Sequence, residues 1–178
     1  MDLPKRKPLR LPSFDYSSPG AYFVTLCTQD KRCILANISV GAGALDGPNV
    51  RLSPYGKSVE KTLEGMAKQY DWLTIDKYVI MPNHVHLLLR LEDDGTSRTP
   101  SPTSTDRQSH ANERIPMLVS TFKRFCNRSC GTDIWQRGYH DHVIRGERDY
   151  CEIWKYIDEN PYKWVNDCYY PTQQDHAP

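Results

Sequence analysis

The stretch from Tyr78 to Arg90 constrains the fold of this chain more than any other part of its sequence. Aliphatic and β-branched residues flank Pro82-Asn83 and predict two strands joined by a tight turn, because Pro fixes φ and Asn tolerates tight conformations. Side chains alternate along a strand. One face of the second strand is then apolar and expected to be buried: Val85, Leu87, Leu89 and Leu91. The opposite face carries His84, His86, Leu88 and Arg90.

The two histidines of this strand point the same way from a rigid element. Residues i and i+2 lie about 6.5–7 Å apart at their Cα atoms, so two imidazoles there can converge on one metal ion. They would leave most of a divalent ion's coordination sphere open, as a catalytic site requires. A His-x-His pair in a strand is more often simply two half-exposed residues, so both interpretations stand at this point.

Length and composition indicate one domain with flexible parts. The chain has 178 residues, 38% of them hydrophobic, and 13 prolines, which favours one core and some disordered length. The net charge of +1 is too small to indicate a nucleic-acid partner by itself. No signal-peptide core or long apolar run is visible, so we expect a cytoplasmic protein that does not enter a membrane.

The order of the segments predicts the domain organisation. Residues 1–19 are Pro-rich and basic, which is typical of an extended arm. Residues 20–168 form the single domain, and 169–178 a tail. Within the domain, residues 92–112 are rich in Ser, Thr and Pro, and we interpret them as a mobile insertion.

A helix from about Pro116 to Cys130 follows this insertion. Its apolar face is expected to contain Leu118, Val119, Phe122, Phe125, Cys126 and Cys130. The opposite face carries three cations, Lys123, Arg124 and Arg128. Such a face is either simply solvated or suited to a phosphate backbone.

The last helix runs from about Glu147 to Asn160 and ends before Pro161, as helices usually do. Its buried stripe is expected to be Tyr150, Ile153, Trp154 and Ile157. Tyr156 lies at the edge of this stripe, and Asn160 projects from the same side one turn later. A tyrosine in this setting is usually part of a core. Above a two-histidine face, however, its hydroxyl could be a nucleophile and the Asn oxygen a further metal ligand.

Six cysteines lack the paired Cys-x-x-Cys spacing of zinc sites, and free thiols are the default expectation. Cys126 and Cys130 are four residues apart, and a second His-x-His pair stands at His140 and His142. A structural zinc site built from these four residues is therefore one alternative. It predicts unfolding when the metal is removed.

Three blocks of the sequence resemble one known family. Met81-Pro-Asn-His-Val-His-Leu-Leu88 resembles the HUH motif of single-tyrosine transposases. Ile134-Trp-Gln-Arg-Gly-Tyr-His-Asp-His-Val-Ile-Arg145 and Tyr156-Ile-Asp-Glu-Asn-Pro161 resemble the REP-associated tyrosine transposase branch (RAYT). The resemblance runs from about Ala21 to Trp164, with the blocks in the same order, and the 92–112 insertion departs from the pattern.

The resemblance implies an α+β fold, a ferredoxin-like antiparallel sheet with helices packed on one face. It implies that His84 and His86 bind a divalent metal, Mg²⁺ or Mn²⁺, with Asn160 as the third ligand. It implies that Tyr156 is the nucleophile, and it assigns no role to His142. Residues expected to bind DNA are Lys123, Arg124, Arg128 and Arg145.

The implied activity is that of a single-stranded DNA endonuclease and transposase, acting on hairpin or repeat DNA through a 5′-phosphotyrosine intermediate. The covalent link would conserve the phosphodiester energy, so that a 3′-OH could reverse the step and join DNA. The alternative from another class is a catalytically inactive nucleic-acid-binding module on the same fold. The oligomeric state is open, a homodimer being one option, as is whether Tyr156 serves its own site or a partner's.

Overall fold

The computed structural model describes residues 14–39, 47–93 and 113–170. Most of the predicted arm, the insertion from residue 94 onward and most of the predicted tail lie outside the described residues. Residues 14–19 do not form an arm, because Tyr16 is buried in the core and its backbone N–H donates to Glu113 (3.0 Å). The division into arm, domain and tail otherwise stays a prediction.

The structure contains the two paired strands and the two later helices that the sequence predicts. In chain order they are β1 (Gly20–Cys27), η1 (Gln29–Lys31), β2 (Ala36–Ser39), β3 (Asn49–Leu52), α1 (Pro54–Gln69), β4 (Leu73–Ile80), β5 (His84–Leu91), α2 (Arg114–Cys130), β6 (His140–Ile144), α3 (Glu147–Glu159) and η3 (Asn160–Asn166). Ser53 caps α1, since its side chain accepts a hydrogen bond from the N–H of Gly56.

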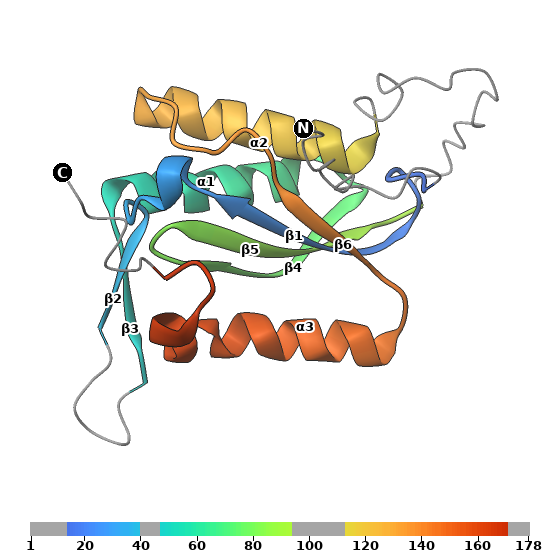
Figure 1. The fold of residues 1–178 in the computed structure, drawn as a ribbon. Helices are drawn as coiled ribbons and strands as arrows, with labels where there is room; N and C mark the ends of the chain where they lie inside the picture. The colour runs from blue at the N-terminus through green and yellow to red at the C-terminus, as the bar shows by residue number, and fades with distance from the viewer. Residues whose placement is uncertain (1–13, 40–46, 94–112, 171–178) are drawn as a thin grey trace, which may run out of the picture.

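A four-stranded antiparallel sheet in the order β4-β5-β1-β6 forms the centre of the molecule (Figure 1). Together with α1 and α2, these strands give the β-α-β-β-α-β order of a ferredoxin-like fold. The predicted α+β class is therefore confirmed. β2 and β3 pair separately as a two-stranded hairpin beside the sheet.

The helices cover both faces of the sheet, not one face as predicted. Helices α1 and α2 lie together on one face, and α3 lies along the other (Figure 1). The α1/α2 face encloses the hydrophobic core, which includes Val24, Leu26, Val59, Leu63, Val85, Leu87, Leu89 and Phe122. Because β5 alternates, the apolar side chains predicted to be buried face this core, and the histidines face α3. None of the described helices combines the length and apolar character needed to cross a bilayer.

Polar contacts hold α3 against the sheet. Only Ile157 of the predicted α3 stripe is buried, and the side chain of Trp154 remains 37% exposed. Lys77 of β4 bonds the carboxylate of Asp158 (2.5 Å), and its ammonium lies 4.4 Å from the ring centroid of Trp154. The predicted apolar stripe was thus wrong in part, because α3 uses cation–π and ionic contacts where burial was expected.

A β-bulge in β4 supplies a second polar contact to α3. The register of β4 against β5 shifts between Ile75 and Lys77, and such a bulge re-aims the extra side chain. The carboxylate of Asp76 accepts hydrogen bonds from Arg90 of β5 and from the hydroxyl of Tyr150 (both 2.9 Å). The first turns of α3 are therefore fixed above the strand that carries the histidines.

Candidate active site

His84 is oriented by the amide of the preceding residue. The Nδ2 group of Asn83 donates to the backbone carbonyls of Lys31 (3.1 Å) and Tyr169 (2.7 Å). These two acceptors fix the amide, so its Oδ1 faces Nδ1 of His84 at 2.9 Å and must accept the proton there. The lone pair of neutral His84 is then on Nε2, which is buried with no hydrogen-bond partner in the described structure.

His86 is held from both sides. Its Nδ1 lies 2.8 Å from the hydroxyl of Thr25 on the neighbouring strand, and its Nε2 lies 3.3 Å from the hydroxyl of Tyr156. The ring of Phe23 stacks on the imidazole at 5.1 Å. The two histidine rings are themselves 4.5 Å apart, so the predicted convergence of the imidazoles occurs.

Burial keeps both imidazoles neutral. It lowers the pKa of His84 to about 3, and it lowers the pKa of His86 to about 3 with a further contribution from the neighbouring His84. A neutral imidazole nitrogen is the form that binds a metal. The two histidines are thus in the ligand-competent state at neutral pH.

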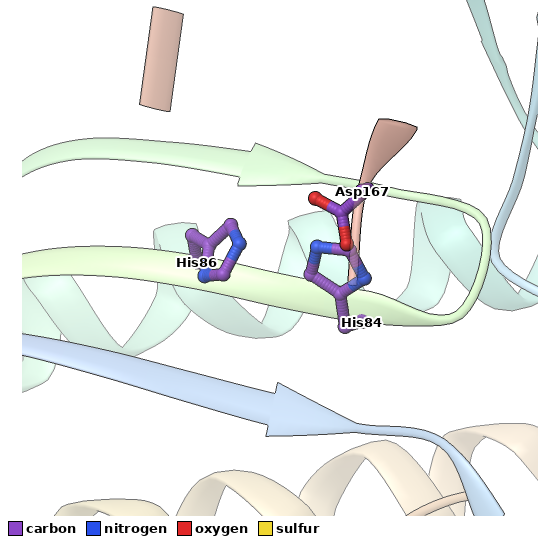
Figure 2. A group of neighbouring side chains, drawn as sticks. All are labelled: His84, His86 and Asp167. Atoms are coloured by element: carbon purple, nitrogen blue, oxygen red, sulfur yellow. The ribbon is translucent and has the colours of Figure 1, made fainter. Parts of the chain in front are cut away.

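Asp167 completes a group that the sequence did not reveal. One ligand atom from each of His84, His86 and Asp167 lies within 4.8 Å of the others, and Figure 2 shows the carboxylate turned toward the two rings. Asp167 follows η3, the 3-10 helix that begins at Asn160. No spacing in the sequence links it to the His-x-His strand, because the turn of η3 determines its approach.

Asn160 lies beside Asp167 in the buried interior of the site. Its Nδ2 donates to the Asp167 carboxylate (3.1 Å), while its Oδ1 is buried without a hydrogen-bond partner in the described structure. Burying an unpaired amide oxygen is costly. The predicted third ligand is therefore close to the histidines, with an oxygen available to a cation.

Tyr156 extends from α3 to the edge of this group. Its side chain is 41% exposed, and its ring packs edge-on against Phe23 (5.9 Å) and His86 (5.2 Å). Burial and the nearby Asp167 raise the pKa of Tyr156 to about 12. The hydroxyl is consequently protonated at neutral pH, and part of the residue is open to solvent.

Tyr169 covers the other end of the site. Its ring lies 4.6 Å from that of His84, and its backbone N–H donates to Asp167 (2.7 Å). The start of the predicted tail is therefore packed against the histidines. Tyr169 also provides the carbonyl that orients Asn83, so this segment helps to fix the tautomer of His84.

The predicted DNA-binding residues do not converge on this group. Lys123, Arg124 and Arg128 belong to α2, on the opposite face of the sheet (Figure 1). Lys123 is half-buried, and its ammonium donates to the carbonyls of Gln136 (2.6 Å) and Gly138 (2.5 Å). Arg145 follows β6, where its backbone N–H donates to Asp149 at the start of α3. Their role in DNA binding stays a prediction.

His142 has a structural contact that its sequence pattern did not indicate. It pairs in register with Phe23 and therefore faces the α3 side of the sheet, at the exposed edge strand β6. Its Nε2 lies 2.8 Å from the carboxylate of Asp149 in the first turn of α3. The contact ties the beginning of α3 to β6.

The zinc alternative is contradicted by the fold. Cys126 and Cys130 pack on the α1/α2 side of the sheet, whereas His140 and His142 face α3. Within residues 14–39, 47–93 and 113–170, the one group of three or more side chains able to share a metal is His84, His86 and Asp167. The cysteines are free thiols, as expected.

Comparison with known proteins supports the resemblance seen in the sequence. An uncharacterised protein of Haemophilus influenzae is 29% identical over 174 residues, which cover 93% of each chain. A second protein of that bacterium, provisionally named a REP-associated tyrosine transposase, is 23% identical over 149 residues, covering 84% of this chain and 74% of the relative. No family model matches the chain.

A solved structure has the same fold. It is a REP-associated tyrosine transposase bound to a REP hairpin, with a TM-score of 0.51 and 20% sequence identity. The match covers 82% of this chain and 68% of the other. The protein described here therefore has the fold of a REP-associated tyrosine transposase and resembles that family in sequence.

Proposed function

We propose that the protein is a metal-dependent endonuclease and transposase that cleaves and rejoins single-stranded DNA through a 5′-phosphotyrosine. The observation that carries the proposal is the 3.3 Å approach of the Tyr156 hydroxyl to Nε2 of His86, at the edge of the His84–His86–Asp167 group. A tyrosine hydroxyl, two neutral imidazoles and a carboxylate are the groups needed for metal-assisted nucleophilic attack on a phosphate.

The donor set fits a divalent cation. His84 and His86 would bind it through their Nε2 atoms, and the buried unpaired oxygen of Asn160 would find a partner. Asp167 adds the anionic oxygen that Mg²⁺ or Mn²⁺ prefers. When bound, the ion would supply Lewis-acid stabilisation of the charge that develops on the scissile phosphate.

Tyr156 is the residue that would form the covalent link. Its oxygen attacks the phosphorus as the hydroxyl proton is lost to solvent, and the bond from phosphorus to the 3′-oxygen of the preceding nucleotide breaks. The product is a 5′-phosphotyrosine and a strand with a free 3′-OH, whose oxygen takes up a proton. The exposed edge of Tyr156 lets a strand approach from solvent, while Phe23 and His86 hold its ring in place.

Single-stranded or hairpin DNA is the proposed partner. The related solved structure is described as bound to a REP hairpin. The edge strand β6 lies on the far side of β1 from the histidines, and Arg145 directly follows its last residue, Ile144. A strand seated on Tyr156 could extend over this edge, where Arg145 would contact phosphate.

The test is a labelled single-stranded hairpin incubated with protein and Mn²⁺ and analysed on a denaturing gel. The expected result is a covalent protein–DNA band with wild type that is absent with Tyr156→Phe and in EDTA. Tyr162→Phe is the matched control, because this exposed tyrosine lies in η3 outside the His-His-Asp group. DNA binding without any covalent band, insensitive to EDTA, would instead establish the inactive binding module.

A further inference from the structure

A surface groove lies on the face of the sheet opposite Tyr156. It has a volume of about 550 Å³ and runs between α1 and α2, the two helices that cover the hydrophobic core. None of its lining residues belongs to the His84–His86–Asp167 group or to α3. We call it the α1/α2 groove, and whatever occupies it does so independently of the chemistry proposed for Tyr156.

The charged side chains that line the groove are all cationic. Lys61 of α1 and Arg124 of α2 both line it, and its lining contains no carboxylate. Neither cation forms an ion pair with a carboxylate elsewhere in the described parts of the chain. The acidic side chains of α1 lie toward β4, where Glu60 accepts a hydrogen bond from the hydroxyl of Tyr78. Burial, with Glu60 and Glu64 nearby, raises the pKa of that hydroxyl. The groove is therefore suited to an anionic ligand.

An aromatic side chain that was predicted to be buried lines the same groove. Phe125 is 43% exposed, and the guanidinium of Arg124 lies 5.5 Å from its ring centroid. Leaving so large an apolar ring in solvent forgoes the stabilisation that burial gives. Tyr70, at the end of α1, contributes a second ring to the lining. Cations beside exposed rings are the combination with which proteins bind unpaired nucleotides.

Gly65 keeps the groove open. It lies in the interior of α1 and lines the cavity, yet a Cβ placed there would meet no atom within 4 Å. Packing against α2 therefore does not require glycine, although glycine makes a helix less stable than alanine would. The absence of a side chain here widens the space between Lys61 and Arg124.

We propose that the α1/α2 groove binds single-stranded nucleic acid, with phosphates at Lys61 and Arg124 and a base against Phe125. The site would hold a strand on the face of the sheet away from Tyr156. It follows from the charge, the exposed ring and the open volume, and it stands whether or not Tyr156 cleaves DNA. Hydroxyl groups of both helices, such as Ser58 and Thr121, would accept or donate hydrogen bonds along the strand.

The test measures fluorescence anisotropy of a labelled oligothymidylate of about 15 nucleotides, within the range of single-strand sites, in EDTA with full-length Tyr156→Phe protein. Adding Lys61→Ala and Arg124→Ala should lower the affinity for the oligonucleotide about tenfold. The slope of log affinity against log salt concentration should also become shallower by about 1.4, because each phosphate contact with a single strand contributes about 0.7 to that slope. Lys57→Ala with Lys68→Ala is the matched control, because these exposed lysines of α1 do not line the groove. An equal loss of affinity in the groove double variant and in the control double variant would overturn the proposal.

Two further variants test the groove without changing its charge. Gly65→Leu should fill the space and weaken oligonucleotide binding about tenfold, while thermal melting shows that the helix is intact. Phe125→Leu should weaken binding severalfold by removing the stacking surface, whose contribution per base is about 1–3 kcal/mol. Unchanged binding by both variants would overturn the proposal. If the covalent band forms but the groove variants bind the oligonucleotide normally, only this inference is refuted. If the groove variants lose affinity but no covalent band forms, only the proposed cleavage is refuted.

Discussion

The hydroxyl of Tyr156 lies 3.3 Å from Nε2 of His86, so the proposed nucleophile occupies the nitrogen that the proposed metal needs. Metal binding at His86 must therefore break this hydrogen bond. The hydrogen bond from Tyr156 to His86 and metal binding by His86 therefore exclude each other.

Tyr156→Phe should bind Mn²⁺ at least as tightly as wild type while losing the covalent product. A hydrogen bond of this kind is worth about 0.5–1.5 kcal/mol net, so removing the competitor should tighten binding by about twofold to tenfold. Titration calorimetry would measure this, with Tyr162→Phe as the control. Weaker Mn²⁺ binding by Tyr156→Phe would show that the hydroxyl is itself a ligand, contrary to this interpretation.

Acid should destabilise the metal-free protein below the ordinary pKa of histidine. The folded-state pKa of His84 and of His86 is lowered to about 3 from 6.5, so the unfolded chain binds protons that the folded chain does not. The stability that the two neutral imidazoles contribute is therefore fully present above pH 6.5 and is lost as the pH falls toward 3. Between pH 7 and pH 5 each of these two histidines should lower the free energy of unfolding by about 2 kcal/mol.

Urea unfolding in EDTA at a series of pH values would measure this loss. The ordinary pKa values of aspartate and glutamate lie below this window, so the histidines should dominate the change. His84→Asn should reduce the loss by about half, since one of the two buried imidazoles is gone. An identical pH dependence in wild type and variant would show that His84 is not responsible.

Lys123 should contribute to stability and not to DNA affinity. Its ammonium donates to the carbonyls of Gln136 and Gly138, and burial lowers its pKa to about 8. Lys123→Met removes both hydrogen bonds and should cost about 1–3 kcal/mol in the free energy of unfolding. Oligonucleotide affinity should stay within about twofold, in contrast to Arg124→Ala. A loss of affinity without a loss of stability would restore Lys123 as a phosphate contact.

Local patterns in the sequence predicted much of the fold. Alternation along β5 placed Leu87 and Leu89 on the face opposite His84 and His86, and the turn residues Pro82-Asn83 marked the end of β4 and the start of β5. These features depend on near neighbours in the chain, which is why composition and spacing reveal them. The resemblance to the transposase family, and not a local pattern, implied that His84, His86 and Tyr156 form one site; in the structure the ring of His86 lies between them, in contact with His84 and with Tyr156.

Features that depend on tertiary packing could not be predicted this way. Phe125 has helical spacing for the core but is exposed, because α2 is rotated so that Phe122 and Cys126 meet the sheet. The basic face of α2 lies away from Tyr156 because α3 crosses the other side of the sheet. Asp167 approaches the histidines only after η3, and no periodicity encodes that path.

Asp167 should be the stronger of the two oxygen ligands that accompany the histidines. Its carboxylate is anionic, whereas Asn160 offers an amide oxygen, and hard divalent cations favour the charged donor. Asp167→Asn should therefore weaken Mn²⁺ binding at least about tenfold, a loss that ligand-shell substitutions commonly reach, and Asn160→Ala should weaken it less. Glu152→Gln, on the exposed face of α3, removes the same charge as a control. Affinity that falls with Asn160→Ala but not with Asp167→Asn would make the amide the third ligand, and the carboxylate would then serve only to hold that amide through its 3.1 Å hydrogen bond.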